Sequence, residues 1–216
     1  MTGAPRIALV DYGMGNRRSV EKALERAGAR VEVTADPGAI RRAGGVVVPG
    51  VGAFPRAMAN LRALGLDELL RERAADGAPV LGICLGMQLL FDASEELGGD
   101  TGLGLVPGTV ARLETAGQRL PHIGWSLVRW ERPSRLVAGL PGETAFYHVH
   151  SYAPRPADPA HVLGTAEYGT RFVTAVARDN VAGVQFHPEK SSTHGLRLLA
   201  GFVGACVADG AAPAAA

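Results

Sequence analysis

The chain has 216 residues, with 22 Lys and Arg against 21 Asp and Glu, which gives a formal net charge of +1. Hydrophobic residues make up 47% and charged residues 20%, a balance typical of a globular protein large enough to bury a sizeable core. The near-neutral charge argues against a broad binding surface for nucleic acid or an anionic membrane. No stretch approaches the ~18 apolar residues of a membrane span, and the N-terminal apolar run is too short for a signal peptide, which favours the cytoplasm.

The first half of the chain alternates short apolar segments with helical patterns. Strands are predicted over 6–10, 31–34, 45–48 and 79–83. Helices are predicted over 20–27 and 57–75, with a stop at Gly28 and a break at Gly65, and the run 87–91 is also helical in pattern. This alternation predicts βαβ units, and therefore a parallel sheet with helices on both faces.

After Gly98 the pattern changes to short β-prone segments separated by Gly and Pro, which predicts a more antiparallel half. These segments are 109–113, 126–130, 146–150, 162–167, 172–177 and 181–186. A last helix over 194–207 carries Cys206 on its apolar stripe, so a packed core thiol is expected there. The fold class is therefore α/β, with a mixed, mostly parallel sheet flanked by helices. We expect one domain over 1–207 and a disordered tail over 208–216.

The strongest local signal for chemistry is Gly82-Ile-Cys84-Leu-Gly86, which lies between an apolar strand and a helical run. Small residues two before and two after a nucleophile are typical of a nucleophile elbow, a tight turn that holds the reactive side chain above the sheet edge. At such a turn the thiol lies at a helix N-terminus, where the helix dipole favours the thiolate. We therefore predict that Cys84 is a nucleophile.

A thiolate nucleophile needs a base, and the candidate lies in Gln-Phe-His187-Pro-Glu189-Lys190. A residue before proline favours extended geometry, so His187 and Glu189 can point the same way. Glu189 would then accept the Nδ1 proton of His187 and leave Nε2 facing Cys84. Lysine is rare in this chain, so Lys190 beside the predicted triad is also a candidate functional residue.

Attack on an acyl carbon also requires donors for the developing oxyanion. The backbone N–H of Leu85, directly after the nucleophile, is one predicted donor. Pro49-Gly50-Val51-Gly52 follows the preceding strand, and its glycines allow a peptide unit to approach a substrate or to reorient. The N–H of Val51 is the second predicted donor.

Two other patterns compete with this interpretation. Gly13-Met-Gly15 follows the first strand as in a dinucleotide-binding fingerprint, but Arg18 occupies the third glycine position. His148 and His150 could place two imidazoles on one strand face, yet no tight Cys-x-x-Cys or His-Glu-x-x-His pattern supports a metal site. We expect no metal, and we expect His150 to face a pocket or a core partner.

Together these segments, over residues 6–207, resemble the class I glutamine amidotransferases and, among them, the glutaminase subunits of imidazole glycerol phosphate synthases. The segments around Cys84 and His187 are similar to the wider class. Four segments are similar to the subunits in particular: Asp-Tyr-Gly-Met-Gly-Asn at 11–16, Pro-Gly-Val-Gly-Ala-Phe at 49–54, Pro-His-Ile-Gly-Trp at 121–125 and Val-His-Ser-Tyr at 149–152.

The resemblance implies a flavodoxin-like fold and a triad of Cys84, His187 and Glu189 that hydrolyses L-glutamine through a thioester to glutamate and ammonia. It implies substrate-binding positions at Gly50, Gly52, Gln88, Ser151 and Tyr152. It also implies a partner, a (β/α)8-barrel cyclase subunit in a heterodimer, which uses the ammonia to make imidazole glycerol phosphate and aminoimidazole carboxamide ribotide in histidine biosynthesis. Interface or gating positions are expected at Asn16, Trp125, Tyr147 and Lys190, and no cofactor is implied.

In this family one oxyanion peptide is out of place until the cyclase binds its substrate, so the resemblance implies weak glutaminase activity in the isolated chain. Ser126, His148 and Ala153 depart from the pattern expected of the subunits, at positions outside the triad. Three alternatives stay open. The chain could serve another synthase, act as a free-standing hydrolase with a cysteine elbow, or be a non-catalytic regulatory module on the same scaffold.

Overall fold

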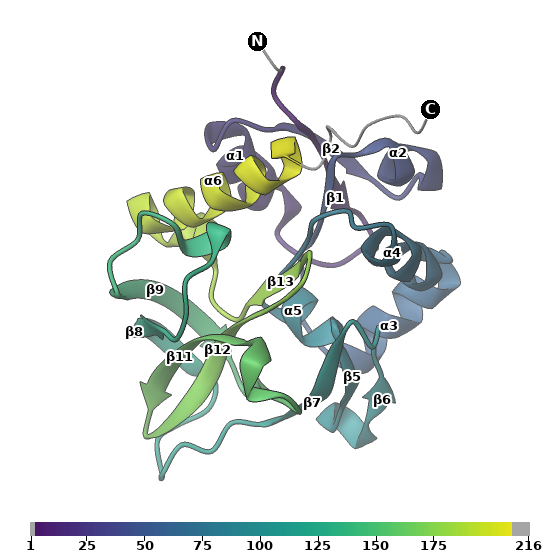
Figure 1. Ribbon diagram of the computed structural model, residues 1–216. Coiled ribbons are helices and arrows are strands. Elements are labelled where there is room, and N and C mark those ends of the chain that lie inside the picture. The colour runs from purple at the N-terminus through teal and green to yellow at the C-terminus, as the bar shows by residue number, and fades with distance from the viewer. Residues whose placement is uncertain (1–2, 209–216) are drawn as a thin grey trace.

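A computed structural model describes residues 3–208 and contains two sheets (Figure 1). The larger sheet begins with parallel strands in the order β2-β1-β3-β4-β13. Their bounds are β1 (Arg6–Val10), β2 (Arg30–Thr34), β3 (Gly45–Val48), β4 (Val80–Ile83) and β13 (Val181–Val184). β13 comes from the end of the chain but pairs with β4, so late residues lie beside the first half of the fold.

The same sheet continues beyond β13 with antiparallel strands in the order β12-β11-β8-β9. Their bounds are β8 (His122–Trp130), β9 (Glu143–His150), β11 (Val162–Tyr168) and β12 (Thr170–Arg178). The sheet is therefore mixed, and its later strands are antiparallel as the sequence predicts.

A smaller sheet has the order β10-β7-β5-β6. Its strands are β5 (Phe91–Ser94), β6 (Asp100–Thr101), β7 (Val106–Arg112) and β10 (Tyr152–Pro156). The 3-10 helices are η1 (Glu96–Gly98), η2 (Arg135–Val137), η3 (Pro159–His161) and η4 (Pro188–Lys190).

Helices cover both faces of the parallel strands (Figure 1). They are α1 (Arg17–Arg26), α2 (Pro37–Arg42), α3 (Phe54–Ala63), α4 (Leu66–Ala75), α5 (Leu85–Leu89) and α6 (Ser192–Ala208). Successive side chains of β1 point to opposite faces. Ile7 and Leu9 pack in the core under α1 and α6, whereas Ala8 and Val10 pack in the core under α2, α3 and α4. Cys206 is buried in the first core, as expected.

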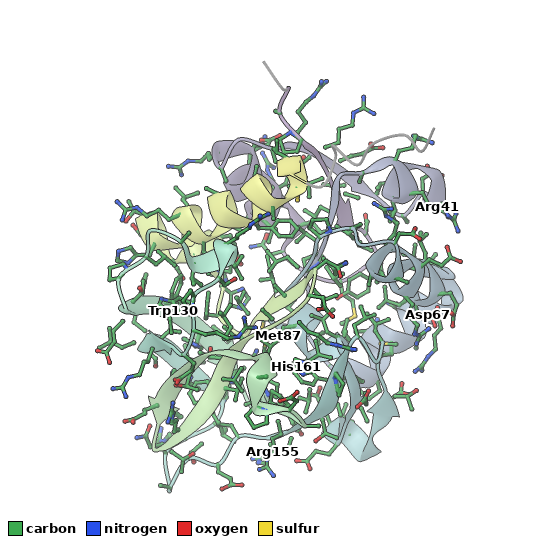
Figure 2. The ribbon with its side chains drawn as sticks, in the orientation of Figure 1. Arg41, Asp67, Met87, Trp130, Arg155 and His161 are labelled. Carbon is green, nitrogen blue, oxygen red and sulfur yellow. The ribbon has the colours of Figure 1, made fainter. Side chains whose placement is uncertain are left out.

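The predicted break at Gly65 separates α3 from α4, and Gly65 has φ 63°, a left-handed conformation that glycine adopts without steric cost. The expected helix over 87–91 is wrong at its end. α5 stops at Leu89, and Phe91 begins β5, where it is fully buried and pairs with Val106 of β7. Figure 2 shows Met87 in the interior of the molecule, where α5 packs on β13.

No helix within residues 3–208 combines the length and the apolar character needed to cross a membrane. The tail expected to be disordered falls mostly on residues 209–216, which lie outside the described part of the chain.

Candidate active site

Cys84 occupies the turn between β4 and α5 with φ 55° and ψ −113°, a conformation that non-glycine residues rarely adopt. The flanking glycines make this turn possible. A Cβ added to Gly82 would lie 2.6 Å from the carbonyl oxygen of Gly86, and a Cβ added to Gly86 would collide with the carbonyl oxygen of Val48. The predicted elbow geometry is therefore present, and both glycines are required by close backbone approach.

His187 reaches Cys84 because β13 lies directly beside β4. The two strands are parallel with Val184 opposite Ile83, and the Cys84 N–H donates to the Val184 carbonyl over 2.8 Å. Carboxyl ends of parallel neighbours meet at one edge of the sheet, so the residues after each strand are adjacent. The His187 N–H donates to the Tyr147 carbonyl over 2.9 Å, which ties this segment to β9.

The His187 imidazole lies between Cys84 and Glu189. Its Nδ1 is 2.8 Å from Oε1 of Glu189, and both side chains are almost fully buried. Burial lowers the pKa of His187, but hydrogen bonds and charge interactions with Cys84 and Glu189 outweigh burial and raise it to about 9. The geometry therefore favours an imidazolium held between a sulfur and a carboxylate.

Two buried amides extend this cluster. Gln185 Nε2 lies 3.7 Å from the Cys84 sulfur, and its Oε1 accepts a hydrogen bond of 3.0 Å from Gln88 Nε2. Gln88 Nε2 is also 3.3 Å from the carbonyl oxygen of Tyr152. Gln88 was predicted as a pocket residue, whereas Gln185 was not singled out.

A pocket of about 250 Å³ opens above the Cys84 sulfur. It brings together residues predicted from distant parts of the sequence, and its lining includes Val51, Gly52, Cys84, Leu85, Gln88, Ser151, Tyr152, His187 and Lys190. Gly50 lies behind this wall, where a Cβ would be 2.7 Å from the Tyr12 hydroxyl and 2.8 Å from the Leu85 Cβ. Gly50 therefore lets its own backbone pack closely against Tyr12 and α5. It was expected to bind substrate, but it does not line the pocket.

Tyr12 holds the segment that carries Val51 through a hydrogen bond to Pro49. The buried Tyr12 hydroxyl donates to the Pro49 carbonyl over 2.6 Å, and burial followed by the charge of Cys84 raises the pKa of Tyr12 above its usual value. Among residues 3–208 the Val51 N–H has no hydrogen-bond acceptor. Leu85 is the first residue of α5, where N–H groups have no intrahelical partner.

Three of the four expected interface residues are neighbours. Trp125 lies opposite Tyr147 on β8 and β9 with ring centroids 6.0 Å apart, and the Lys190 ammonium is 5.9 Å from the Tyr147 ring centroid. Asn16 is apart from them at the start of α1, where its side chain accepts from the Ser19 N–H.

Glu96 also lines the pocket and was not predicted. It lies on η1, and its Oε2 accepts a hydrogen bond of 2.8 Å from the Phe54 N–H at the start of α3. No local motif marks it, because its position depends on how the loop after β5 returns to α3.

His148 and His150 have hydrogen-bond partners within the protein. His150 lines the pocket as expected, and its Nδ1 is 2.8 Å from the Tyr152 carbonyl. His148 is buried between the Phe146 carbonyl and the Thr174 hydroxyl. Within the described part of the chain, no group of three or more His, Cys, Asp or Glu is arranged to hold a metal ion.

Comparison with known proteins gives a family for the chain. The family model for class-I glutamine amidotransferases matches residues 8–205. The chain is 57% identical over 196 residues to the imidazole glycerol phosphate synthase subunit HisH of Moorella thermoacetica, covering 91% of this chain and 93% of that one. It is 50% identical over 206 residues to the subunit HisH of Synechococcus elongatus, covering 94% of each chain.

Solved structures share the fold at lower identity. A glutamine amidotransferase crystal structure matches with a TM-score of 0.73 at 21% identity, covering 92% of this chain and 98% of that one. The structure of PurLQS from Thermotoga maritima matches with a TM-score of 0.73 at 18% identity, covering 93% and 98%. These two likenesses concern the fold alone. The family match and the HisH relatives go further: the chain belongs to the class-I glutamine amidotransferases, in the group of the HisH subunits of imidazole glycerol phosphate synthase.

Proposed function

We propose that this amidotransferase is the glutaminase subunit of an imidazole glycerol phosphate synthase and hydrolyses L-glutamine with Cys84, His187 and Glu189. The observation that carries the proposal is the position of the His187 imidazole between a strained cysteine and a buried carboxylate, beneath a pocket large enough for an amino acid. Membership of an amidotransferase family supports the choice of a carboxamide as substrate.

In the first half of the reaction, the Cys84 thiolate attacks the side-chain carbonyl carbon of glutamine. A carbon–sulfur bond forms while the carbonyl π electrons move to oxygen, where the N–H groups of Val51 and Leu85 stabilise the negative charge. When the carbonyl re-forms, the carbon–nitrogen bond breaks. The departing nitrogen takes the His187 proton and leaves as ammonia, with a γ-glutamyl thioester on Cys84.

In the second half, the neutral His187 imidazole accepts a proton from water as the water oxygen attacks the thioester carbon. The carbon–sulfur bond then breaks, the γ-carboxyl group of the product gives its proton to solvent as glutamate leaves, and the thiolate faces an imidazolium again. Glu189 remains ionised throughout and holds the imidazole through Nδ1.

The rest of the pocket supplies groups that suit an amino acid. The Glu96 carboxylate offers a partner for the α-ammonium group, and Gln88, Ser151 and Tyr152 line the same space. Gly52 has φ 108°, a conformation that favours glycine, and it lines the pocket with backbone alone.

The proposal includes a partner, a (β/α)8-barrel cyclase subunit in a heterodimer, which receives the ammonia in histidine biosynthesis. β8 presents three large apolar side chains to solvent, Ile123 at 59%, Trp125 at 55% and Leu127 at 61% exposure, and a row of this kind suits a protein interface. Ammonia in water at neutral pH is mostly ammonium, so a partner docked near the pocket would preserve the reactive form. We place this reaction in the cytoplasm, where Cys84 stays reduced.

The direct experiment measures glutamate release by the chain alone, then with the cyclase subunit, then with the cyclase and its nucleotide substrate. We expect weak release in the first case and stimulation of about 10² to 10³ in the last, the effect of one oxyanion donor moving into place. Full activity without any partner would contradict the coupling, and no stimulation would favour a different synthase.

Cys84→Ala tests the division of labour between the two subunits. We expect it to abolish glutamine-dependent synthesis by the complex and to leave ammonia-dependent synthesis largely intact, because the cyclase chemistry lies elsewhere. Cys206→Ala, at the other thiol, should retain both activities, because Cys206 lies on α6 and its side chain is buried in the core. Equal loss of both activities in an assembled Cys84→Ala complex would be inconsistent with a dedicated nucleophile.

A further inference from the structure

Three polar side chains connect the active-site pocket to a separate groove on the surface. The Ser126 hydroxyl is 3.0 Å from Nε2 of His122, and Nδ1 of His122 is 3.1 Å from Nε2 of His150. Nδ1 of His150 is 2.8 Å from the carbonyl oxygen of Tyr152. The contacts run from β8 across β9 to the start of β10.

The carbonyl at the end of this chain fixes the direction of every hydrogen bond. A carbonyl oxygen only accepts, so Nδ1 of His150 donates to Tyr152, and in a neutral ring Nε2 is then an acceptor. Nδ1 of His122 must therefore donate to His150, which leaves Nε2 of His122 as an acceptor. Within residues 3–208, the group placed to donate to that atom is the hydroxyl of Ser126.

The surroundings keep both rings neutral and fixed. His122 and His150 are buried, and burial lowers the pKa of both, that of His150 to about 3. The Tyr168 ring stacks on His122 with centroids 4.1 Å apart. His148 stacks on the other side at 5.1 Å, but its ring nitrogens are engaged by the Phe146 carbonyl and by Thr174, so it stays outside the relay.

Each end of the chain lies at a cavity. At the inner end, the Tyr152 carbonyl also accepts from Gln88, which joins Gln185 and the Cys84 sulfur. At the outer end, Ser126 lines an open groove of about 460 Å³, whose other walls include Trp125, Leu127, Arg129, Glu143, Thr165, Glu167 and Arg171. The groove lies over β8 and β11, away from the pocket that contains Cys84.

We infer that Ser126, His122 and His150 are positioning residues for glutamine. They form a hydrogen-bond relay with a single donor-to-acceptor direction, which starts at Ser126 in the surface groove. The relay holds the Tyr152 carbonyl in place, and with it the Gln88 side chain that donates to that carbonyl. The inference rests on the proposed function, because it assumes that glutamine occupies the pocket beside Tyr152. When substitution removes the Ser126 hydroxyl, Nε2 of His122 loses its hydrogen-bond donor. The His122 ring then favours the tautomer in which Nε2 carries the proton. Nδ1 of His122 then faces Nε2 of His150 as a second acceptor, and the relay breaks.

The first test measures the histidine tautomers directly, in the chain labelled with ¹⁵N-histidine, by long-range ¹H–¹⁵N correlation spectra at pH 7. We expect the Nδ1–H tautomer for His122 and His150. In Ser126→Ala we expect the His122 signals to move toward the Nε2–H tautomer. An Nε2–H tautomer for His150 in the unsubstituted chain, or no change at His122 in Ser126→Ala, would overturn the relay.

The second test measures KM and kcat for glutamine in the complex with the cyclase subunit. Ser126→Ala should raise KM about three- to tenfold, the range for loss of one hydrogen bond, with kcat changed less than about twofold. Arg129→Ala is the matched control, because Arg129 lines the same groove but takes no part in the relay. An unchanged KM in Ser126→Ala, or an equal rise in Arg129→Ala, would contradict the positioning role.

A conservative variant separates the relay from a general structural role. In His122→Asn the amide Nδ2 can donate to His150 without help from Ser126, so KM should stay near its original value. Adding Ser126→Ala to His122→Asn should then have no further effect. A rise in KM as large as that of Ser126→Ala alone would refute the relay. Absence of glutamine hydrolysis in the unsubstituted complex would overturn the proposed function instead, while the tautomer spectra would still decide the relay.

Discussion

The pKa of the His187 imidazole is raised by Cys84 and, in second place, by the Glu189 carboxylate. The carboxylate contributes one hydrogen bond of 2.8 Å and a buried negative charge, while its other oxygen has no hydrogen-bond partner among residues 3–208. Glu189→Gln keeps an acceptor for Nδ1 but removes the charge and buries an unpaired amide N–H group. We expect the pKa of His187 to fall from about 9 and kcat to fall about 10²- to 10⁴-fold. An NMR titration of His187 and steady-state kinetics of the complex measure the two effects.

A lower pKa of His187 in Glu189→Gln should also change the pH dependence of activity. With the pKa of His187 near 9, the imidazolium persists through neutral pH, and activity should decline only as pH rises through that range. In Glu189→Gln the alkaline decline should move to lower pH. Glu32→Gln, on the exposed edge strand β2, is the matched control and should leave the profile unchanged. An unaltered profile in Glu189→Gln would mean that Glu189 does not govern His187.

Residues marked by local geometry could be identified from the sequence, whereas residues placed by tertiary contacts could not. Cys84 is marked by the two glycines that its turn requires, and His187 by its neighbours Pro188 and Glu189. Glu96 reaches the pocket only because the loop after β5 returns to α3, and Gln185 reaches the Cys84 sulfur only because β13 pairs with β4. Sequence reasoning therefore picked out three residues that lie together in the structure, but it missed part of their surroundings.

At the level of elements, the turn between β4 and α5 depends on Gly86. Because a Cβ there would collide with the Val48 carbonyl, Gly86→Ala should displace β3 or α5, lower the free energy of unfolding by about 1–3 kcal/mol and abolish glutaminase activity. Gly204→Ala is the matched control. Its Cβ meets no atom within 4 Å on the exposed side of α6, so it should stabilise the chain by about 0.5–1 kcal/mol. Denaturant unfolding measures both, and equal stability of the two variants would contradict the packing argument.

The elements that sequence reasoning missed are those in which local pattern and tertiary pairing differ. The run 87–91 is apolar apart from Gln88 and is short enough to fit a helix or a buried strand equally. Pairing with β7 decides the conformation of Phe91. β10 contains Pro154 and Pro156, which argue against a strand in the sequence. The structure places β10 at the edge of the smaller sheet, where a missing N–H is tolerated.

For the whole molecule, the buried histidines predict a loss of stability in acid. His150 has a pKa of about 3 when folded and about 6.5 when unfolded, so below pH 6.5 the unfolded chain binds the additional proton. This one group should lower the free energy of unfolding by about 2 kcal/mol between pH 7 and pH 5. His187 acts in the opposite direction: with a folded pKa raised to about 9, its stabilising contribution is full below pH 6.5 and declines as pH rises from there through 9. Between pH 7 and pH 5 it therefore returns about 0.8 kcal/mol, which offsets less than half of the His150 loss and is common to both proteins in the comparison. Urea unfolding at pH 5, 6 and 7 should show a loss about 2 kcal/mol smaller in His150→Asn, and equal losses in the two proteins would rule out a neutral, buried His150.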